Sequence, residues 1–204
     1  MVGGALCMLH PLFSQALPVG NELDVEAVLR WYDGAKHTVA TPSDLSAHGY
    51  TPGYALMKFE RDNAPAPVVD TALRIEETRD EATFLRVCAE GMGLTDPPGG
   101  FVGAPGFRCF IARDDDEPAA CAALYQDGDI AWLGIAVTRP DFRGRGGQRA
   151  LLSARIEAAR ETGAHRLTTE TGERVPGKPD QSYRNILRAG FREAYLRPTW
   201  QSPR

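Results

Sequence analysis

The chain has 204 residues, of which 43% are hydrophobic and 25% charged, proportions that are ordinary for a globular protein. They exclude wholesale disorder and collagen-like repetition. With 23 basic and 27 acidic residues the net charge is −4, so the chain lacks the basic excess expected of a general nucleic-acid binder.

The N-terminal segment and the cysteines both favour a cytoplasmic protein. The first 21 residues carry no charge, so the basic region of a secretory signal is missing, and glycine, proline and polar residues interrupt the apolar run. The four cysteines form neither a C-x-x-C pair nor a zinc-binding spacing with histidine. We therefore expect reduced thiols, no bound metal, no membrane span and a cytoplasmic location.

Residues 34–41 are similar to residues 163–170 further along the chain. Each stretch begins with Gly-Ala after a helical pattern, and each is followed by a glycine next to an aromatic residue, in Gly49-Tyr50 and Gly190-Phe191. We interpret residues 1–62 as a partial, degenerate copy of the C-terminal module whose front half is missing. Such a copy would pack against the main sheet or exchange a strand with it.

A proline-rich segment, residues 63–67, follows and is typical of a short stiff linker. It leads into a main domain that we assign to residues 68–204. Within this domain the hydrophobic pattern predicts a strand over residues 68–75 and a helix over residues 81–92. A loop rich in glycine and proline then precedes residue 107.

The clearest signal for strand pairing is a hairpin over residues 119–137. Two apolar runs flank Asp127-Gly128, a dipeptide typical of a type I′ turn. The second run is apolar on both faces, which indicates a central strand covered on both sides. Gly134 inside this run indicates a bulge or the close approach of another group.

The remaining elements complete a mixed fold. The patterns predict a strand over 107–112, a helix over 147–162, a strand over 166–170, a helix from Asp180 to Ala189 and a last strand over 191–200. This order predicts an α/β, or α+β, fold with a mixed sheet and one strand–helix–strand crossover.

A glycine-rich turn lies between the central strand and the following helix, with the sequence Arg143-Gly144-Arg145-Gly146-Gly147-Gln148. Successive glycines let backbone N–H groups approach an anion closely, and the helix N-terminus adds its dipole and its free donors. The two arginines can add charge-assisted hydrogen bonds. The turn therefore predicts a cradle for a phosphate or a diphosphate.

Other interpretations of this turn fit less well. No Lys-Ser/Thr pair follows the glycines as in a P-loop, and Arg149 stands where a dinucleotide-binding fingerprint needs its third glycine. An Arg-Gly segment that binds RNA would lie in a disordered basic tail. A tight turn with two solvated arginines stays open as the purely structural interpretation.

Residues 137–147, Val-Thr-Arg-Pro-Asp-Phe-Arg-Gly-Arg-Gly-Gly, resemble the acetyl-CoA-binding motif of the GNAT superfamily of N-acetyltransferases. The pattern of that family is Arg/Gln-x-x-Gly-x-Gly/Ala. Arg143 and Gly146 match it, whereas Gln148 departs from its last position.

A second stretch, residues 185–191, resembles the family's helix that ends in Gly-Phe before a strand. The family often carries a tyrosine as general acid four residues before that glycine, where this chain has Ile186. The resemblance is specific over about residues 107–200.

The resemblance implies a mixed, mostly antiparallel GNAT-like sheet with flanking helices, in which two central parallel strands splay apart around residues 135–137 and 167–170. It also implies acetyl-CoA as co-substrate, with its pantetheine arm in the gap and its diphosphate on the glycine-rich turn. The implied cofactor-binding residues are Ile135, Ala136, Val137, Arg143, Gly144, Arg145, Gly146, Gly147 and Gln148. We add Ser182 and Asn185, because residues three apart share one face of a helix.

Acyl transfer to an amine needs a general base for the amine and a proton for the departing thiolate. Glu170, at the end of an inner strand, is our candidate base, and Tyr195, on the last strand, is our candidate acid. The structural alternatives are an ion-paired or solvated Glu170 and a packed Tyr195. The four histidines show no spacing typical of metal ligands.

We therefore expect an N-acetyltransferase that passes the acetyl group of acetyl-CoA to a primary amine of a small molecule or peptide by direct attack. The alternative is a non-catalytic sensor or scaffold that binds CoA or acyl-CoA on the same fold. An RNA-binding role is weaker, because the net charge is negative. We expect no nucleic acid or membrane partner, and a homodimer is one way to complete the partial module.

Overall fold

The computed structural model describes residues 1–2, 5–8, 15–18, 23–97 and 99–203. It divides into two compact units: residues 58–194 form the larger, and residues 1–57 with 195–204 form the smaller. Much of the uncharged N-terminal segment lies outside the described residues, so our expectation for it stays a prediction. Within the described ranges, no helix is long and apolar enough to cross a membrane.

The smaller unit holds a five-stranded sheet in the order β1-β2-β3-β12-β4. Its elements are β1 (Ala5–Met8), β2 (Gln15–Pro18), α1 (Val25–Tyr32), β3 (Thr38–Val39), β4 (Thr51–Pro52) and β12 (Trp200–Gln201). Helix α1 joins the parallel strands β2 and β3, and it coincides with the predicted helical pattern. Strand β12 pairs antiparallel with both β3 and β4, so a strand from late in the chain lies between two strands from early in the chain.

The smaller unit has its own apolar core. Val28 and Tyr32 of α1 pack with Val39, Leu45 and Tyr50. A buried histidine, His37, stacks on the Tyr32 ring, and its Nε2 lies 2.7 Å from the Tyr50 hydroxyl oxygen. Burial lowers the pKa of His37 below its ordinary value. The unit therefore has the packed interior of a folded body, and its interpretation as a degenerate module stays a prediction.

The larger unit is built on a seven-stranded sheet in the order β11-β5-β10-β9-β8-β7-β6. The strands are β5 (Leu56–Asp62), β6 (Arg74–Thr78), β7 (Phe107–Asp114), β8 (Glu117–Asp127), β9 (Ile130–Thr138), β10 (Arg166–Gly172) and β11 (Arg192–Arg197). The pairs from β6 to β9 are antiparallel, whereas β9 and β10 are parallel. The predicted mixed, mostly antiparallel sheet is confirmed.

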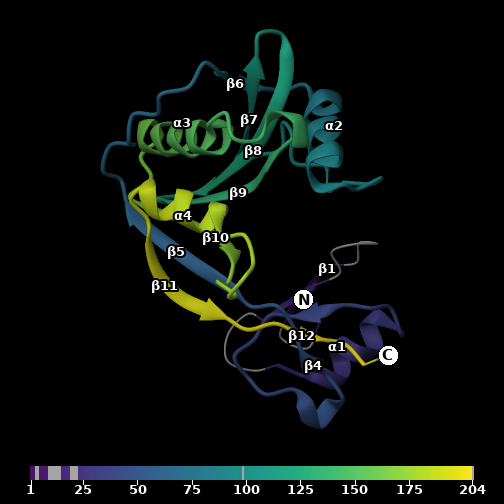
Figure 1. Cartoon of the computed structure of the whole chain (residues 1–204). Coiled ribbons are helices and arrows are strands. Elements are labelled where there is room, and N and C mark those ends of the chain that lie inside the picture. The colour runs from purple at the N-terminus through teal and green to yellow at the C-terminus, as the bar shows by residue number, and fades with distance from the viewer. Residues whose placement is uncertain (3–4, 9–14, 19–22, 98, 204) are drawn as a thin grey trace. The chain divides into compact units, whose positions relative to one another are not determined.

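Helices cover both faces of this sheet (Figure 1). Helix α2 (Glu81–Met92) lies on one face and α3 (Gly147–Glu161) on the other, with α4 (Gln181–Arg188) beside α3. The Asp80 side chain accepts a hydrogen bond from the Thr83 N–H and so caps α2. Because β7 and β8 are buried between α2 and α3, their residues are apolar on both faces.

The cysteines of this core are free thiols. Cys88 of α2 and Cys121 of β8 have their sulfur atoms 3.3 Å apart, and both side chains are fully buried. Cys109 is buried beside them, and burial raises its pKa to about 11. The Cys109 thiol is therefore protonated at neutral pH, and all three buried cysteines pack as small apolar side chains. The side chain of Cys7 lies outside the described part of the chain.

Two predicted strands differ from the structure. Residues 68–73 are not a strand, because the Thr71 hydroxyl bonds to Arg145 O and to the Leu73 N–H and holds the chain in a turn. The predicted strand over 191–200 is two strands, β11 and β12, in different sheets. Pro198 lies between them and has no N–H with which to continue a ladder.

Asp180 is the residue that could cap α4, but its side chain makes no capping hydrogen bond. It has ion pairs with Arg184, at 3.1 Å, and Arg174, at 3.6 Å. These two guanidinium groups compete with the backbone N–H groups for the carboxylate oxygens. The helix still begins directly after Asp180, and it ends before Gly190, which takes the left-handed conformation with φ of 85°.

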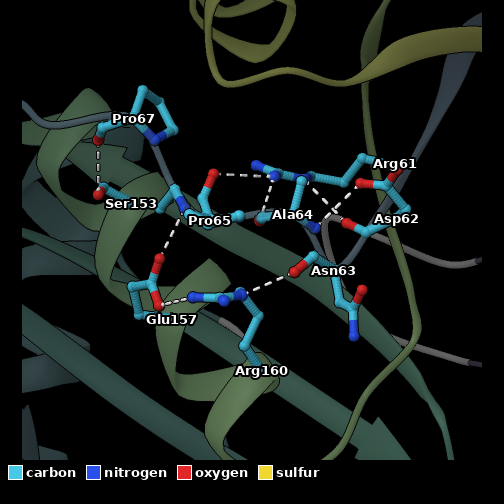
Figure 2. A network of polar contacts seen from close by, with 10 residues as sticks. Arg61, Asp62, Asn63, Ala64, Pro65, Pro67, Ser153, Glu157 and Arg160 are labelled. Atoms are coloured by element: carbon cyan, nitrogen blue, oxygen red, sulfur yellow. Dashed lines mark hydrogen bonds and ion pairs between the residues drawn. The ribbon is translucent and has the colours of Figure 1, made fainter.

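The linker at residues 63–67 is bound to α3 rather than free (Figure 2). The Ser153 hydroxyl donates to Pro67 O at 3.0 Å, Arg160 Nε donates to Asn63 O at 2.7 Å, and the Ala66 N–H donates to Glu157 at 2.6 Å. Arg61, which is only 6% exposed, donates to Ala64 O at 2.5 Å and to Ala189 O at 2.6 Å. The linker is therefore part of the folded larger unit.

Replacement of Arg61 by methionine should destabilise the larger unit. The Ala189 carbonyl would lose its buried donor, and one such orphaned group costs about 1–3 kcal/mol of the free energy of unfolding. Urea denaturation followed by far-UV circular dichroism measures this loss. An unchanged unfolding midpoint would contradict the structural importance of the Arg61 hydrogen bonds.

Candidate functional site

The site is organised around the end of β9, where this strand separates from β10. The parallel pairing ends at Leu133 opposite Thr169, although β9 continues to Thr138 and β10 to Gly172. The predicted splay is therefore present, and on β10 it begins at Glu170, because the first three residues of the range 167–170 are still paired with β9. Beyond this point the two strands present backbone groups to a gap.

A β-bulge lies on the other edge of β9, opposite the gap. Ala123 faces Gly134 but Ala122 faces Ala136, so Ile135 is the extra residue. Ile135 has a φ of 44°, which is rare for a β-branched residue. A Cβ atom at Gly134 would overlap the Trp132 indole. The sequence predicts either a bulge or a close approach at Gly134. The structure has both, with the close approach at Gly134 and the bulge at the next residue, Ile135.

An open cavity of about 810 Å³ lies beside this bulge. It is lined by residues of β9, of the glycine-rich turn, of α4 and of the turn at Asp70. All the predicted cofactor-binding residues except Ile135 line it: Ala136, Val137, Arg143, Gly144, Arg145, Gly146, Gly147, Gln148, Ser182 and Asn185. The structure therefore brings these separate predictions together in one place.

The glycines of the turn have the conformations that an anion cradle needs. Gly144 and Gly146 have φ of 81° and 85°, and Gly146 is the residue that precedes α3. A Cβ at Gly147 would come within 3.2 Å of Leu73 and 3.4 Å of Ala120. The N–H groups of the first helical turn have no partner within the helix, and their residues line the cavity.

The cavity is lined mainly by positive charge. Four arginines, Arg143, Arg145, Arg149 and Arg188, line it together with one carboxylate, Asp70. Arg145 also has an ion pair with Asp114, which lies outside the lining. Because like charges gathered in one cavity attract an anion, the lining fits a ligand that carries several phosphates.

Sequence reasoning missed three of these charged residues. A signal for Arg188 was present, because it follows Asn185 by three residues and so shares its helix face. Arg149 follows the glycine-rich turn directly. Asp70 had no local signal, since the pattern around it predicts a strand and only the turn at Thr71 brings it to the cavity.

Gln148, the residue that departs from the GNAT motif, links α3 to α4. Its Nε2 donates to the Ser182 hydroxyl oxygen at 2.9 Å, and its Oε1 accepts from Asn185 Nδ2 at 2.6 Å. Asn185 also accepts from Gln181 Nε2 at 2.8 Å. The side chains of Ser182 and Asn185 are therefore held by Gln148, which fixes one wall of the cavity.

The two predicted catalytic residues do not line the cavity. Glu170 directly follows the last paired residue of β10, and its carboxylate accepts from Lys58 Nζ at 2.5 Å. Both side chains are partly buried, with 25% and 17% of their surfaces exposed. Tyr195 lies on β11 with 58% of its surface exposed. The ion-paired alternative for Glu170 is therefore realised, with a lysine as partner.

Tyr183 of α4 is a second tyrosine near the cavity wall, and its hydroxyl is engaged. It donates to a Glu193 oxygen at 2.5 Å, while the Arg174 guanidinium lies 4.4 Å from the centre of its ring. Burial raises the pKa of Tyr183 to about 12, and the bonded carboxylate of Glu193 acts in the same direction. A phenol with so high a pKa is a poor proton donor at neutral pH.

Within the part of the chain that the structure describes, no three His, Cys, Asp or Glu side chains are grouped so as to hold a metal ion. The described cavity offers backbone donors and arginines for the binding of a ligand.

Comparisons with known proteins give one family and one fold. The sequence profile described as the acetyltransferase (GNAT) family matches residues 72–175. A comparison with curated proteins finds no match. The solved structures with a similar fold include GCN5-related N-acetyltransferases from Sphaerobacter thermophilus and Kribbella flavida and a tandem GNAT protein from the clavulanic acid biosynthesis pathway.

The three structures share the fold at low sequence identity. The Sphaerobacter protein has a TM-score of 0.71 at 14% identity, with 97% of this chain and 75% of that chain covered. The Kribbella protein has a TM-score of 0.67 at 15% identity, with 100% and 88% covered. The tandem protein has a TM-score of 0.61 at 16% identity, with 92% and 74% covered.

The high pKa of Tyr183 can be measured directly. The difference between the absorbance titrations of the wild type and Tyr183→Phe should show one phenolate that forms near pH 12, above the ordinary value of about 10. Because the folded pKa is raised, the Tyr183–Glu193 contribution to stability is complete below about pH 10 and is lost as the pH rises through the folded value. A titration near pH 10 would contradict the buried hydrogen bond.

Proposed function

This chain belongs to the acetyltransferase (GNAT) family, and from that membership we propose that it transfers the acetyl group of acetyl-CoA to a primary amine of a small molecule or peptide. One observation carries the proposal: a glycine-rich turn, a helix N-terminus and four arginines line one cavity beside a bulged, splayed strand. This combination suits a ligand with a diphosphate at one end and an extended arm at the other.

The residues present fit acetyl-CoA. Gly144 and Gly146 have conformations that favour glycine, so no side chain covers the backbone of the turn at these positions and a diphosphate can approach it. The positive charges of the four lining arginines outnumber the single negative charge of Asp70, and the excess can balance the negative charge of the phosphates. Acetyl-CoA supplies a thioester carbon that an amine can attack directly.

The backbone of β9 is placed to act on the acyl group. Leu133 O accepts from the Thr169 hydroxyl at 2.7 Å and so points toward β10. Because backbone groups alternate along a strand, the Ile135 N–H also points toward β10, at the level where pairing has ended. A donor in that gap stabilises the negative charge that develops on the carbonyl oxygen as the amine attacks.

We assign proton transfer to the two candidate side chains. We assign Glu170 as the base that takes a proton from the amine, because it directly follows the residue at which β10 leaves β9. Tyr195 is the proposed acid for the departing thiolate. Its phenol is 58% exposed, whereas that of Tyr183 is buried and bonded to Glu193.

The smaller unit enters the proposal as a degenerate second module over residues 1–62. In it, as in the larger unit, one helix joins two parallel strands. The glycine after each helix, Gly34 and Gly163, has φ of 80° and 85°. These two shared features support a common origin for the two halves of the chain.

Two residues favour a second candidate function, a CoA-binding sensor without turnover. Gln148 stands where the family pattern has glycine or alanine, and its side chain is bonded across the cavity wall to Ser182 and Asn185. Ile186 stands where the family often has its tyrosine acid. Binding of acetyl-CoA without acetylation of any amine would favour this function.

Removal of Arg145 should weaken acetyl-CoA binding. The loss of one charge-assisted hydrogen bond, about 1.5 kcal/mol, raises the dissociation constant by about tenfold. Titration calorimetry of the wild type and Arg145→Ala with acetyl-CoA, CoA and ATP measures the change. Arg74→Ala is the matched control, because Arg74 is also an exposed, ion-paired arginine but lies outside the cavity lining. No acetyl-CoA binding by the folded wild type would sink the proposed function.

Replacement of Glu170 by glutamine should lower kcat and leave the KM for acetyl-CoA unchanged. A general base contributes about 10²–10⁴-fold to the rate, and the amide cannot accept the proton. Thiol release with a panel of polyamines, aminoglycosides, amino acids and peptides measures the effect. Lys58→Met is the control, because it breaks the same ion pair but keeps the carboxylate. Equal losses in the two variants would show that only the ion pair matters.

A further inference from the structure

Arg155 of α3 is a fully buried cation beneath the bulge. Its side chain is 1% exposed, and its three hydrogen bonds, all at 3.0 Å, go to main-chain carbonyl oxygens. Nε donates to Leu151 O on its own helix, while Nη1 donates to both Ala123 O and Gly134 O. Ala123 and Gly134 form the last strand pair before the register shift at Ile135.

The burial of this charge is unfavourable on its own. A guanidinium loses its hydration in the core, and burial lowers the pKa of Arg155 to about 9, which still leaves it protonated at neutral pH. An apolar side chain would pack there without that penalty. The guanidinium, unlike an apolar side chain, supplies hydrogen-bond donors. These donors satisfy main-chain carbonyl groups at the position where the bulge interrupts the β8–β9 ladder.

The two bonded carbonyl groups fix the direction of the next peptide. Leu133 O points toward β10, so the next carbonyl along the strand, that of Gly134, points to the β8 side, and Arg155 Nη1 bonds to it together with Ala123 O of β8. The described peptides are trans, so the Ile135 N–H points opposite to that carbonyl, into the gap toward β10. Arg155 and the acyl site thus lie at opposite ends of one peptide group.

A cation at the carbonyl end of a peptide strengthens its N–H as a donor. Hydrogen bonds in a chain polarise one another, and the effect is larger when one partner is charged and shielded from water. The Arg155 guanidinium is buried, and it bonds directly to the oxygen of the Gly134–Ile135 peptide.

We propose that Arg155 is a positioning residue for acyl transfer: through the Gly134–Ile135 peptide it fixes the bulge and strengthens the N–H that faces the acyl carbonyl. The inference rests on the proposed function, because it requires acetyl-CoA in the gap. It assigns a role in the reaction to a residue that lies on the far side of the strand from the gap.

The test is the infrared absorption of the carbonyl of [1-¹³C]acetyl-CoA bound to the full-length protein. A hydrogen bond to this carbonyl lowers its stretching frequency, so the wild type should shift the band below that of free acetyl-CoA. Arg155→Met should lose most of the shift, and Arg155→Lys, which keeps the charge but not the fork of donors, should recover part of it. Binding is followed separately by calorimetry.

Arg61→Met is the matched control. Arg61 is also a buried arginine, 6% exposed, that donates to main-chain carbonyls, but it holds the linker and the end of α4 instead of the bulge. It should therefore lose stability and keep the wild-type carbonyl band.

The outcomes separate the two proposals. A wild-type protein that binds acetyl-CoA with an unshifted band overturns the inference, as does a full shift in Arg155→Met or an equal loss in Arg61→Met. If Arg155→Met does not fold, Arg155→Lys decides: a band between those of the free and wild-type-bound states supports the inference, and the wild-type band overturns it. A folded wild type that does not bind acetyl-CoA overturns the proposed function, and the inference falls with it.

Discussion

The site depends on one constraint: β9 keeps its parallel pairing with β10 only as far as Leu133. Beyond that residue the backbone of β9 needs support from elsewhere, and the bulge at Ile135 shows where the strand changes register with β8 as well. Arg155 provides this support through its hydrogen bonds to Ala123 O and Gly134 O. The gap and the bulge therefore lie at the same departure from regular pairing, and the glycine-rich turn before α3 follows β9 a few residues later.

Positive charge serves two different purposes on the two sides of this strand. The arginines that line the cavity are mostly exposed, so water screens them, and they suit the recognition of phosphate. Arg155 is enclosed, and its hydrogen bonds go to main-chain carbonyl groups. In our proposals the same residue type thus attracts the ligand at the surface and polarises a peptide group in the core.

Features that depend on neighbouring residues could be predicted from the sequence. The hairpin is predicted from Asp127-Gly128, although its two loop residues are Gly128 and Asp129 and only Gly128 has the positive φ that a type I′ turn needs at both positions. Helix α2 is predicted from its periodicity, and the cradle from glycines that share one turn. Features that depend on contacts between residues far apart in the sequence could not be predicted from it. Nothing local indicates that Thr71 would bond to Arg145 O, that Gln148 would join α4, or that Arg155 would reach the Gly134 carbonyl. The residue that departs from the family motif proves to be the one that connects two helices.

The position of β12 between β3 and β4 has a consequence for the order in which the protein is synthesised and folds. Strands β3 and β4 leave the ribosome early, yet the strand between them is Trp200–Gln201. Residues 58–194 are all synthesised before β12, and they can begin to fold as one body. Strands β3 and β4 of the smaller sheet cannot be joined until β12 has been synthesised. Their pairing with β12 then closes a very long loop of the chain. Strands β3 and β4 are thus synthesised well before the strand that joins them.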